Sequence, residues 1–131
     1  MKKFIAIGLL SLTSASAFSA PAKPFYECSG LADVEENRVG INLNSNKAGF
    51  FDNDSTSYLR LTDTKILESY PPQTQMIFQG KDAGYAGTLK LYFNLTRKTV
   101  SLYSIDKKGK STEIGSALCK IAKPWNDKEL N

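Results

Sequence analysis

Apolar and polar residues alternate at every second position over much of this chain. The pattern is clearest in residues 88–95 (TLKLYFNL), and it continues over 99–105 and 112–121. A period of two residues is typical of strands with one buried face. The polar segments 96–98 and 106–110 that separate them are typical of hairpin turns. The last third of the chain is therefore predicted to form three antiparallel strands.

Shorter strands with the same period are predicted upstream. They cover residues 25–30, 39–43, 48–51, 58–63, 65–69 and 75–78, with 65–69 either separate or an extension of the strand before it. Residues 31–37 could form a helical turn or a loop, and no long apolar stripe of helical period is present. About eight strands, spaced roughly 8–12 residues apart, predict an all-β domain. We expect a single small antiparallel barrel or meander, with a β-sandwich as the alternative.

The first residues have the layout of a secretory signal peptide. A positive start precedes the apolar run 4–12, and small residues follow it with an A-x-A cleavage site ending at Ala17. The run is about half the roughly 20 residues that span a bilayer, so we expect no membrane-spanning segment. Residues 1–17 are thus interpreted as a bacterial signal peptide without lipidation, and 18–131 as one periplasmic or secreted domain. Its polar tail, 123–131, contains Trp125, which we expect to cover an open barrel end or to form an exposed contact.

Two cysteines, Cys28 and Cys119, lie near the two ends of the predicted domain. An exported chain matures where thiols oxidise, and no histidine is present to activate a catalytic thiol. We therefore predict a disulfide between them, worth roughly 4–5 kcal/mol for so long a loop. Such a bridge requires the two Cα atoms to lie within about 7 Å, so the first and last strands must come close. That closeness favours a barrel.

Charge excludes one class of partner and suggests another. Loss of Lys2 and Lys3 with the signal peptide takes the basic residues from 17 to 15 against 13 acidic ones, and the net charge from +4 to +2. No long basic run remains, so we expect no nucleic-acid binding. Residues 27–82 carry nine acidic side chains against five basic ones. Among these acidic residues, Asp33, Glu35 and Glu36 are candidate contacts for a charged partner.

Residue types argue against most familiar catalytic and cofactor sites. The absence of histidine excludes histidine-based triads and histidine-bound zinc, and two cysteines cannot form a four-cysteine metal site. Phosphate-binding, dinucleotide and nucleophile-elbow motifs are absent. We therefore assign no catalytic residue and no cofactor. The glycine-rich segment 80–87 is interpreted as a hairpin loop, in which Tyr85 is a candidate partner contact.

One segment resembles the opening of a calcium loop. Oxygen-bearing residues stand at alternate positions, Asp52, Asp54 and Thr56, with Asp63 at the twelfth position. The glycine that such a loop needs at its sixth position is Ser57 here, and strands rather than helices are predicted on both sides. A polar hairpin loop is therefore the preferred interpretation, and no metal site is assigned.

The two ends of the chain resemble a known family. The Tyr26-Glu27-Cys28 start, the length of about eight strands and the second cysteine near the end are similar to small periplasmic β-barrels such as the C-type lysozyme inhibitors. The central loop signature of that family is not recognisable, so no functional residue is transferred.

The sequence favours a binding protein over an enzyme. We expect an exported, non-enzymatic and monomeric β-barrel module that binds an unknown protein or small ligand through its surface loops. One alternative is a proteinaceous inhibitor of a basic secreted enzyme such as a lysozyme. The others are a structural envelope component and a small hydrolase that uses acidic residues.

Overall fold

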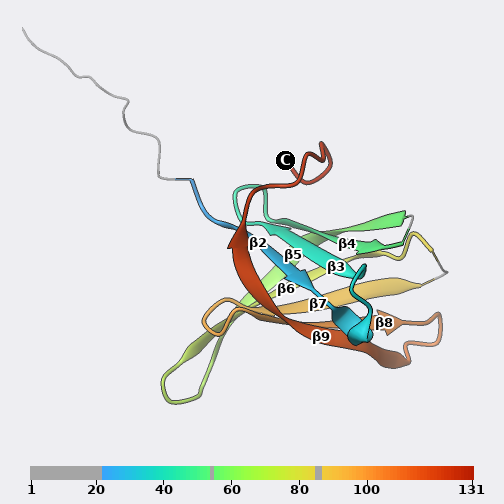
Figure 1. Ribbon diagram of the computed structural model, residues 1–131. Helices are drawn as coiled ribbons and strands as arrows, with labels where there is room; N and C mark the ends of the chain where they lie inside the picture. The colour runs from blue at the N-terminus through green and yellow to red at the C-terminus, as the bar shows by residue number, and fades with distance from the viewer. Residues whose placement is uncertain (1–21, 54, 85–86) are drawn as a thin grey trace, which may run out of the picture.

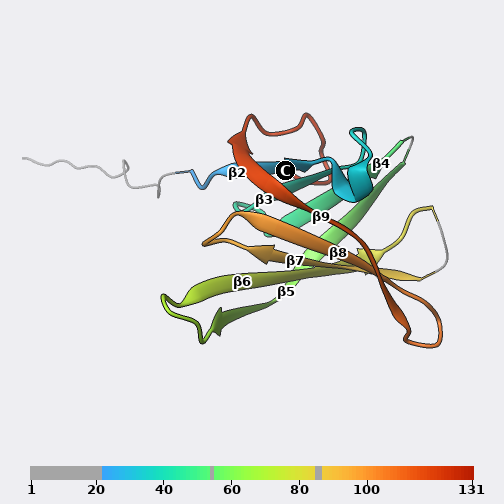
Figure 2. The ribbon, with the colours of Figure 1, turned by 60° about the horizontal axis from the view of Figure 1, so that its bottom comes forward.

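The fold is a closed antiparallel β-barrel, as predicted. A computed structural model describes residues 22–53, 55–84 and 87–131, so the predicted signal peptide, Asp54 and Tyr85 lie outside the described residues. Eight strands follow one another around the barrel in chain order (Figures 1 and 2). They are β2 (Phe25–Ser29), β3 (Arg38–Asn42), β4 (Lys47–Asp52), β5 (Ser55–Leu67), β6 (Gln73–Lys81), β7 (Thr88–Asn94), β8 (Thr99–Ile105) and β9 (Ser111–Ala122). One 3-10 turn, η3 (Leu31–Asp33), lies between β2 and β3.

Because the strands run alternately up and down, successive connections lie at opposite ends of the barrel. Each strand pairs with the one before it, and β9 returns to pair with β2. The β2–β3, β4–β5, β6–β7 and β8–β9 connections therefore share one end, which we call the loop end. The remaining hairpins lie at the other end, which we call the terminal end because β2 begins and β9 finishes there. Residues that are far apart in sequence thus meet at the loop end.

The predicted disulfide closes the seam between the first and last strands. Cys28 of β2 stands directly opposite Cys119 of β9 in the antiparallel ladder, with a Cα–Cα distance of 4.1 Å, and the two sulfurs are bonded. Cys28 is fully buried. The bridge is compatible with an oxidising compartment outside the cytosol.

Alternate side chains of the strands fill the barrel interior. In β7 the three apolar residues Leu89, Leu91 and Phe93 are fully buried, whereas the residues between them are half-buried on the outer face. Leu31 of η3 is also fully buried in the core, so this turn closes part of the loop end. Gly115 of β9 allows the η3 backbone to lie against β9, because a Cβ at this position would be 2.5 Å from the Ala32 nitrogen. The interior is thus a packed core over most of its length.

Of the two alternatives for residues 65–69, extension of the strand before them is the correct one, and β6 is longer than the sequence pattern predicts. Residues 58–63 and 65–69 belong largely to one strand of 13 residues, which has a register shift between Leu61 and Asp63. β6 pairs with it as far as Gln73 opposite Leu67. The two strands form a hairpin that projects from the body of the barrel at the terminal end (Figures 1 and 2).

The tail 123–131 lies across the outer surface of β2, β3 and β4, so the prediction that Trp125 covers an open barrel end is wrong. The indole Nε1 of Trp125 donates a hydrogen bond to Glu27 Oε1 at 3.0 Å, and its ring centroid lies 5.9 Å from that of Phe25. Leu130 is fully buried and packs against Gly49. The physical reason is that Gly40 of β3 and Gly49 of β4 have no side chains on this outer surface, which leaves an apolar strip on which Trp125 and Leu130 lie.

A hydrogen bond to β5 also holds the tail. The Tyr58 hydroxyl donates to Asp127 Oδ2 at 2.8 Å. Burial raises the pKa of Tyr58 above its usual value, and the negative charge of the hydrogen-bonded Asp127 raises it further. The tail is therefore a docked part of the domain.

Candidate functional site

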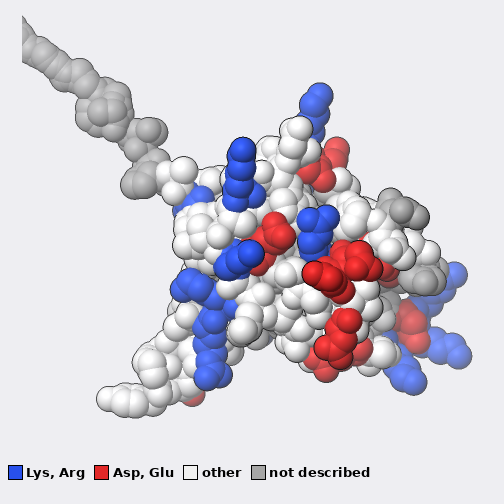
Figure 3. Space-filling model, viewed as in Figure 1, with Lys and Arg blue, Asp and Glu red and all other residues white. Residues whose placement is uncertain are grey.

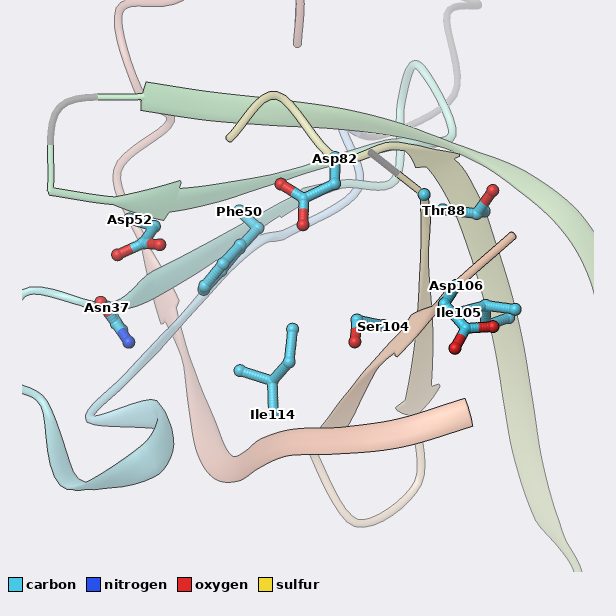
Figure 4. Close-up of a pocket in the computed structure, with 10 residues that line it drawn as sticks. Asn37, Phe50, Asp52, Asp82, Thr88, Ser104, Ile105, Asp106 and Ile114 are labelled. Carbon is cyan, nitrogen blue, oxygen red and sulfur yellow. The ribbon is translucent and has the colours of Figure 1, made fainter. Parts of the chain in front are cut away.

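A cavity of about 270 Å³ opens at the loop end of the barrel (Figure 4). Its volume is near the lower end of the roughly 300–1,000 Å³ that is typical of ligand pockets. All four loop-end connections, or the strand ends beside them, contribute to it. The lining residues are Asn37, Phe50, Asp52, Asp82, Gly87, Thr88, Ser104, Ile105, Asp106 and Ile114. Its size suits one small molecule or one protruding side chain.

Apolar side chains form part of the wall. Phe50 of β4 is only 5% exposed, and Ile105 and Ile114 are half-buried. Phe50 and Ile114 face the cavity from opposite sides (Figure 4). Contact with these side chains would remove apolar surface of a ligand from water, which favours binding.

Three carboxylates, those of Asp52, Asp82 and Asp106, also line the cavity, and no Lys or Arg is among the described lining residues. Asp106 is exposed, and its Oδ1 accepts hydrogen bonds from the Lys108 and Lys110 amides at 2.9 and 2.8 Å. That carboxylate therefore serves mainly to close the β8–β9 turn. Asp52 and Asp82 are half-buried, and the Asp82 carboxylate points into the cavity (Figure 4). These two are the better candidates for ligand contact.

Buried polar side chains fix the connections that surround the cavity. Ser57 of β5 is 4% exposed, and its hydroxyl oxygen accepts a hydrogen bond from the Ala83 amide at 2.8 Å. Asp82 Oδ1 accepts from the Gly84 amide at 2.9 Å, which orients its carboxylate. Asn37 is buried, and its Nδ2 donates to the Leu31 carbonyl at 3.4 Å. The Ser57 contact thus holds the described part of the β6–β7 connection to β5, and the Asn37 contact closes the β2–β3 connection on itself.

The acidic residues chosen from the sequence lie beside this cavity but do not line it. Asp33, Glu35 and Glu36 are exposed in the β2–β3 connection, which also contains the lining residue Asn37. Acidic side chains gather on the part of the surface where η3 lies (Figure 3). They extend negative charge outward from the cavity on the η3 side of the loop end, whereas the β8–β9 connection at the same end carries the exposed Lys107, Lys108 and Lys110.

The residues that resembled a calcium loop do not come together. Asp52 lies at the loop end, where the β4–β5 hairpin turns, whereas Asp63 lies far along β5 on the projecting hairpin. Asp63 is instead 3.9 Å from the Lys65 ammonium. Thr56 belongs to β5, and Asp54 is outside the described residues. Within the described part of the chain, no group of three or more Asp, Glu, His or Cys residues could hold a metal ion.

Fold and cavity together define a class of protein: a disulfide-closed, eight-stranded antiparallel β-barrel with an acidic cavity at one end. No family model, curated protein or solved structure matches the chain. The resemblance to the C-type lysozyme inhibitors thus rests on the two chain ends and on the barrel alone. Across residues 22–53, 55–84 and 87–131, no helix is long and apolar enough to cross a membrane.

Proposed function

We propose that this chain is an exported, non-enzymatic binding module whose loop-end cavity takes a positively charged group on an apolar stem. The observation that carries the proposal is the composition of the cavity. Asp52 and Asp82 are half-buried beside Phe50 and Ile114, and the described lining contains no basic residue. An ammonium or guanidinium group would pair with the carboxylates while its stem contacts the apolar wall.

Partial burial makes this pairing more favourable than one on an open surface. Water and salt screen a half-buried carboxylate less than an exposed one, so its attraction to a cation is stronger. Because the Gly84 amide already orients the Asp82 carboxylate, binding would cost little further ordering of that side chain. The signal-peptide pattern of residues 1–17 and the disulfide support the exported location.

Calorimetric or NMR titration with a short alkylammonium ion tests the proposal. The ion should bind more tightly than the alcohol and the carboxylate of the same chain length, and its affinity should fall as salt is added. Asp82→Asn keeps the acceptor for the Gly84 amide but removes the charge, and should weaken binding roughly tenfold. The Asp52→Asn variant should behave similarly.

Glu68→Gln is the matched control, because Glu68 is exposed in the β5–β6 connection at the other end of the barrel. It should leave the affinity for alkylammonium unchanged. Equal binding of the ammonium ion and the alcohol would contradict the proposal, as would full affinity in Asp82→Asn. Chemical shift changes confined to residues outside the cavity would contradict the assigned site.

A second candidate function is inhibition of a basic secreted enzyme such as a lysozyme, in which the cationic group is a side chain of the enzyme. The specific observation that favours it is the exposed acidic set Asp33, Glu35 and Glu36 beside the cavity. Replacing all three with Asn or Gln should then slow association with the enzyme and weaken inhibition at low salt. The same triple variant should bind alkylammonium as the unmodified protein does, which separates the two candidates.

A further inference from the structure

The projecting part of β5 has one edge without a strand partner in the described part of the chain, although the barrel itself is closed. β4 pairs with β5 only as far as Lys47 opposite Arg60, and the Leu61 amide then donates to the Asn46 carbonyl at 3.0 Å. Beyond that point β5 continues to residue 67 and pairs with β6 on its other side alone. Among the described residues, the outer edge of 62–67 therefore has no strand partner. We call this segment the β5 edge.

The β5 edge presents backbone groups that can still form a ladder. The Thr64 amide donates to Asp63 Oδ1 at 2.8 Å, a local acceptor that water or another strand could replace. This contact indicates that the Thr64 amide faces outward from the β5–β6 ladder. Residues 62–66 are all exposed, and Ile66 is 64% exposed. An exposed edge of this length is a template for pairing with another strand.

The sequence of this edge is complementary to itself in the antiparallel direction. Residues 61–67 read Leu-Thr-Asp-Thr-Lys-Ile-Leu. When two copies pair about Thr64, leucine stands opposite leucine and a β-branched residue opposite a β-branched residue. Asp63 then stands opposite Lys65 of the second copy, and this happens twice because the arrangement is symmetric. Opposite charges directly across an antiparallel pair stabilise it, whereas like charges destabilise it.

We infer that two copies of this chain form a two-fold symmetric dimer by antiparallel pairing of their β5 edges, centred on Thr64. The two Thr64 residues exchange backbone hydrogen bonds, since their amides face outward. The Asp63–Lys65 pair within each copy, now about half exposed on both side chains, becomes part of a cluster of four alternating charges. This isologous arrangement is the commonest symmetry among oligomers. The sequence alone predicts a monomer. It does not reveal the open edge, which is evident only from the strand pairing in the structure.

The charges of Asp63 and Lys65 favour a second copy of this chain over any other strand as the partner of the β5 edge. Charged residues on an edge usually deter pairing. Here the two charges are opposite in sign and lie at symmetric positions about Thr64, so they deter most other strands but match a second copy. The inference is independent of the cavity, since the β5 edge lies at the terminal end.

Multi-angle light scattering and sedimentation of the purified exported protein, with its disulfide intact, test the dimer over a range of concentrations. The unmodified protein should show a concentration-dependent dimer. Asp63→Lys places lysine opposite Lys65 at two positions, and should raise the dimer dissociation constant about tenfold or more. Lys65→Asp places aspartate opposite Asp63 and should do the same.

Two matched samples isolate the charge pairing. The double variant Asp63→Lys/Lys65→Asp restores opposite charges across the axis and should dimerise again. An equal mixture of the two single variants should form a heterodimer, because each then meets its opposite charge in the other. Far-UV circular dichroism and thermal unfolding of the monomers should be unchanged, since the substituted side chains are exposed.

Three outcomes would overturn the inference. The unmodified protein could remain monomeric at every concentration. The dimer could persist in both single variants, which would locate it on another surface. The double variant could stay monomeric like the single ones, which would show that charge complementarity does not specify the pairing. Asp82→Asn should leave the dimer intact, so failure of this inference is distinguishable from failure of the proposed cavity function.

Discussion

Replacing Cys28 and Cys119 together with alanine is expected to lower the free energy of unfolding by about 4–5 kcal/mol. The two residues are 91 positions apart, so the bridge removes much of the freedom of the unfolded chain. Small domains are stable by only about 5–15 kcal/mol, so the loss is a large part of the total. Urea unfolding of the oxidised protein and of the double variant measures the difference as a lower midpoint.

The position of the bridge predicts where the barrel opens first. β2 has five residues, and four register pairs join it to β9, from Phe25 opposite Ala122 to Cys28 opposite Cys119. Without the bridge, amide exchange should accelerate most in β2 and β9. The reason is that local opening begins where the fewest contacts must break, which is the short β2–β9 pairing. Reduction of the unmodified protein should reproduce both effects. Equal stability of the oxidised protein and the double variant would contradict the prediction.

The sequence was most informative where a strand has one face in the core. In β7 and β8 the period of two residues follows burial, so their bounds were predicted within one residue. The projecting part of β5 is different, because residues 62–66 are exposed on both faces. Strands were predicted over 58–63 and 65–69, but without a buried face the pattern could not decide whether they form one strand or two. For the same reason, the sequence pattern could not show that the β5 edge lacks a strand partner, which is the basis of the dimer inference.

The cavity was only partly predictable. Asp52 belongs to the calcium-like spacing in the sequence, but no motif or spacing indicates Asp82 or Phe50. The signal that could have grouped the carboxylates is topology, because alternate hairpins of an up-and-down barrel share one end. The distribution of charge along the sequence indicates Asp33, Glu35 and Glu36 instead, which lie beside the cavity. How far each connection folds over the barrel end depends on contacts such as Ser57 with Ala83, which no periodic pattern encodes.

Leu130→Ala is expected to lower the free energy of unfolding by about 2–5 kcal/mol, the usual range for a buried leucine. Composition makes the tail 123–131 look like a polar extension, but Leu130 is fully buried against Gly49 on the outer surface of β4. The Ser45 hydroxyl donates to the Leu130 carbonyl, and Asn42 Nδ2 donates to Asn131 Oδ1 at 3.3 Å. Urea unfolding of the variant measures the loss.

Lys128→Ala is the control, because Lys128 is an exposed neighbour in the same segment and its change should stay within about 0.5 kcal/mol. Trp125→Ala should also destabilise the domain, since it removes the ring that packs on Phe25 and leaves Glu27 without its indole donor. If Leu130→Ala were as stable as Lys128→Ala, the tail would be dispensable and the outer strip of β2–β4 would be free surface. A loss confined to Leu130→Ala and Trp125→Ala would instead establish that this barrel buries apolar side chains on both sides of its wall.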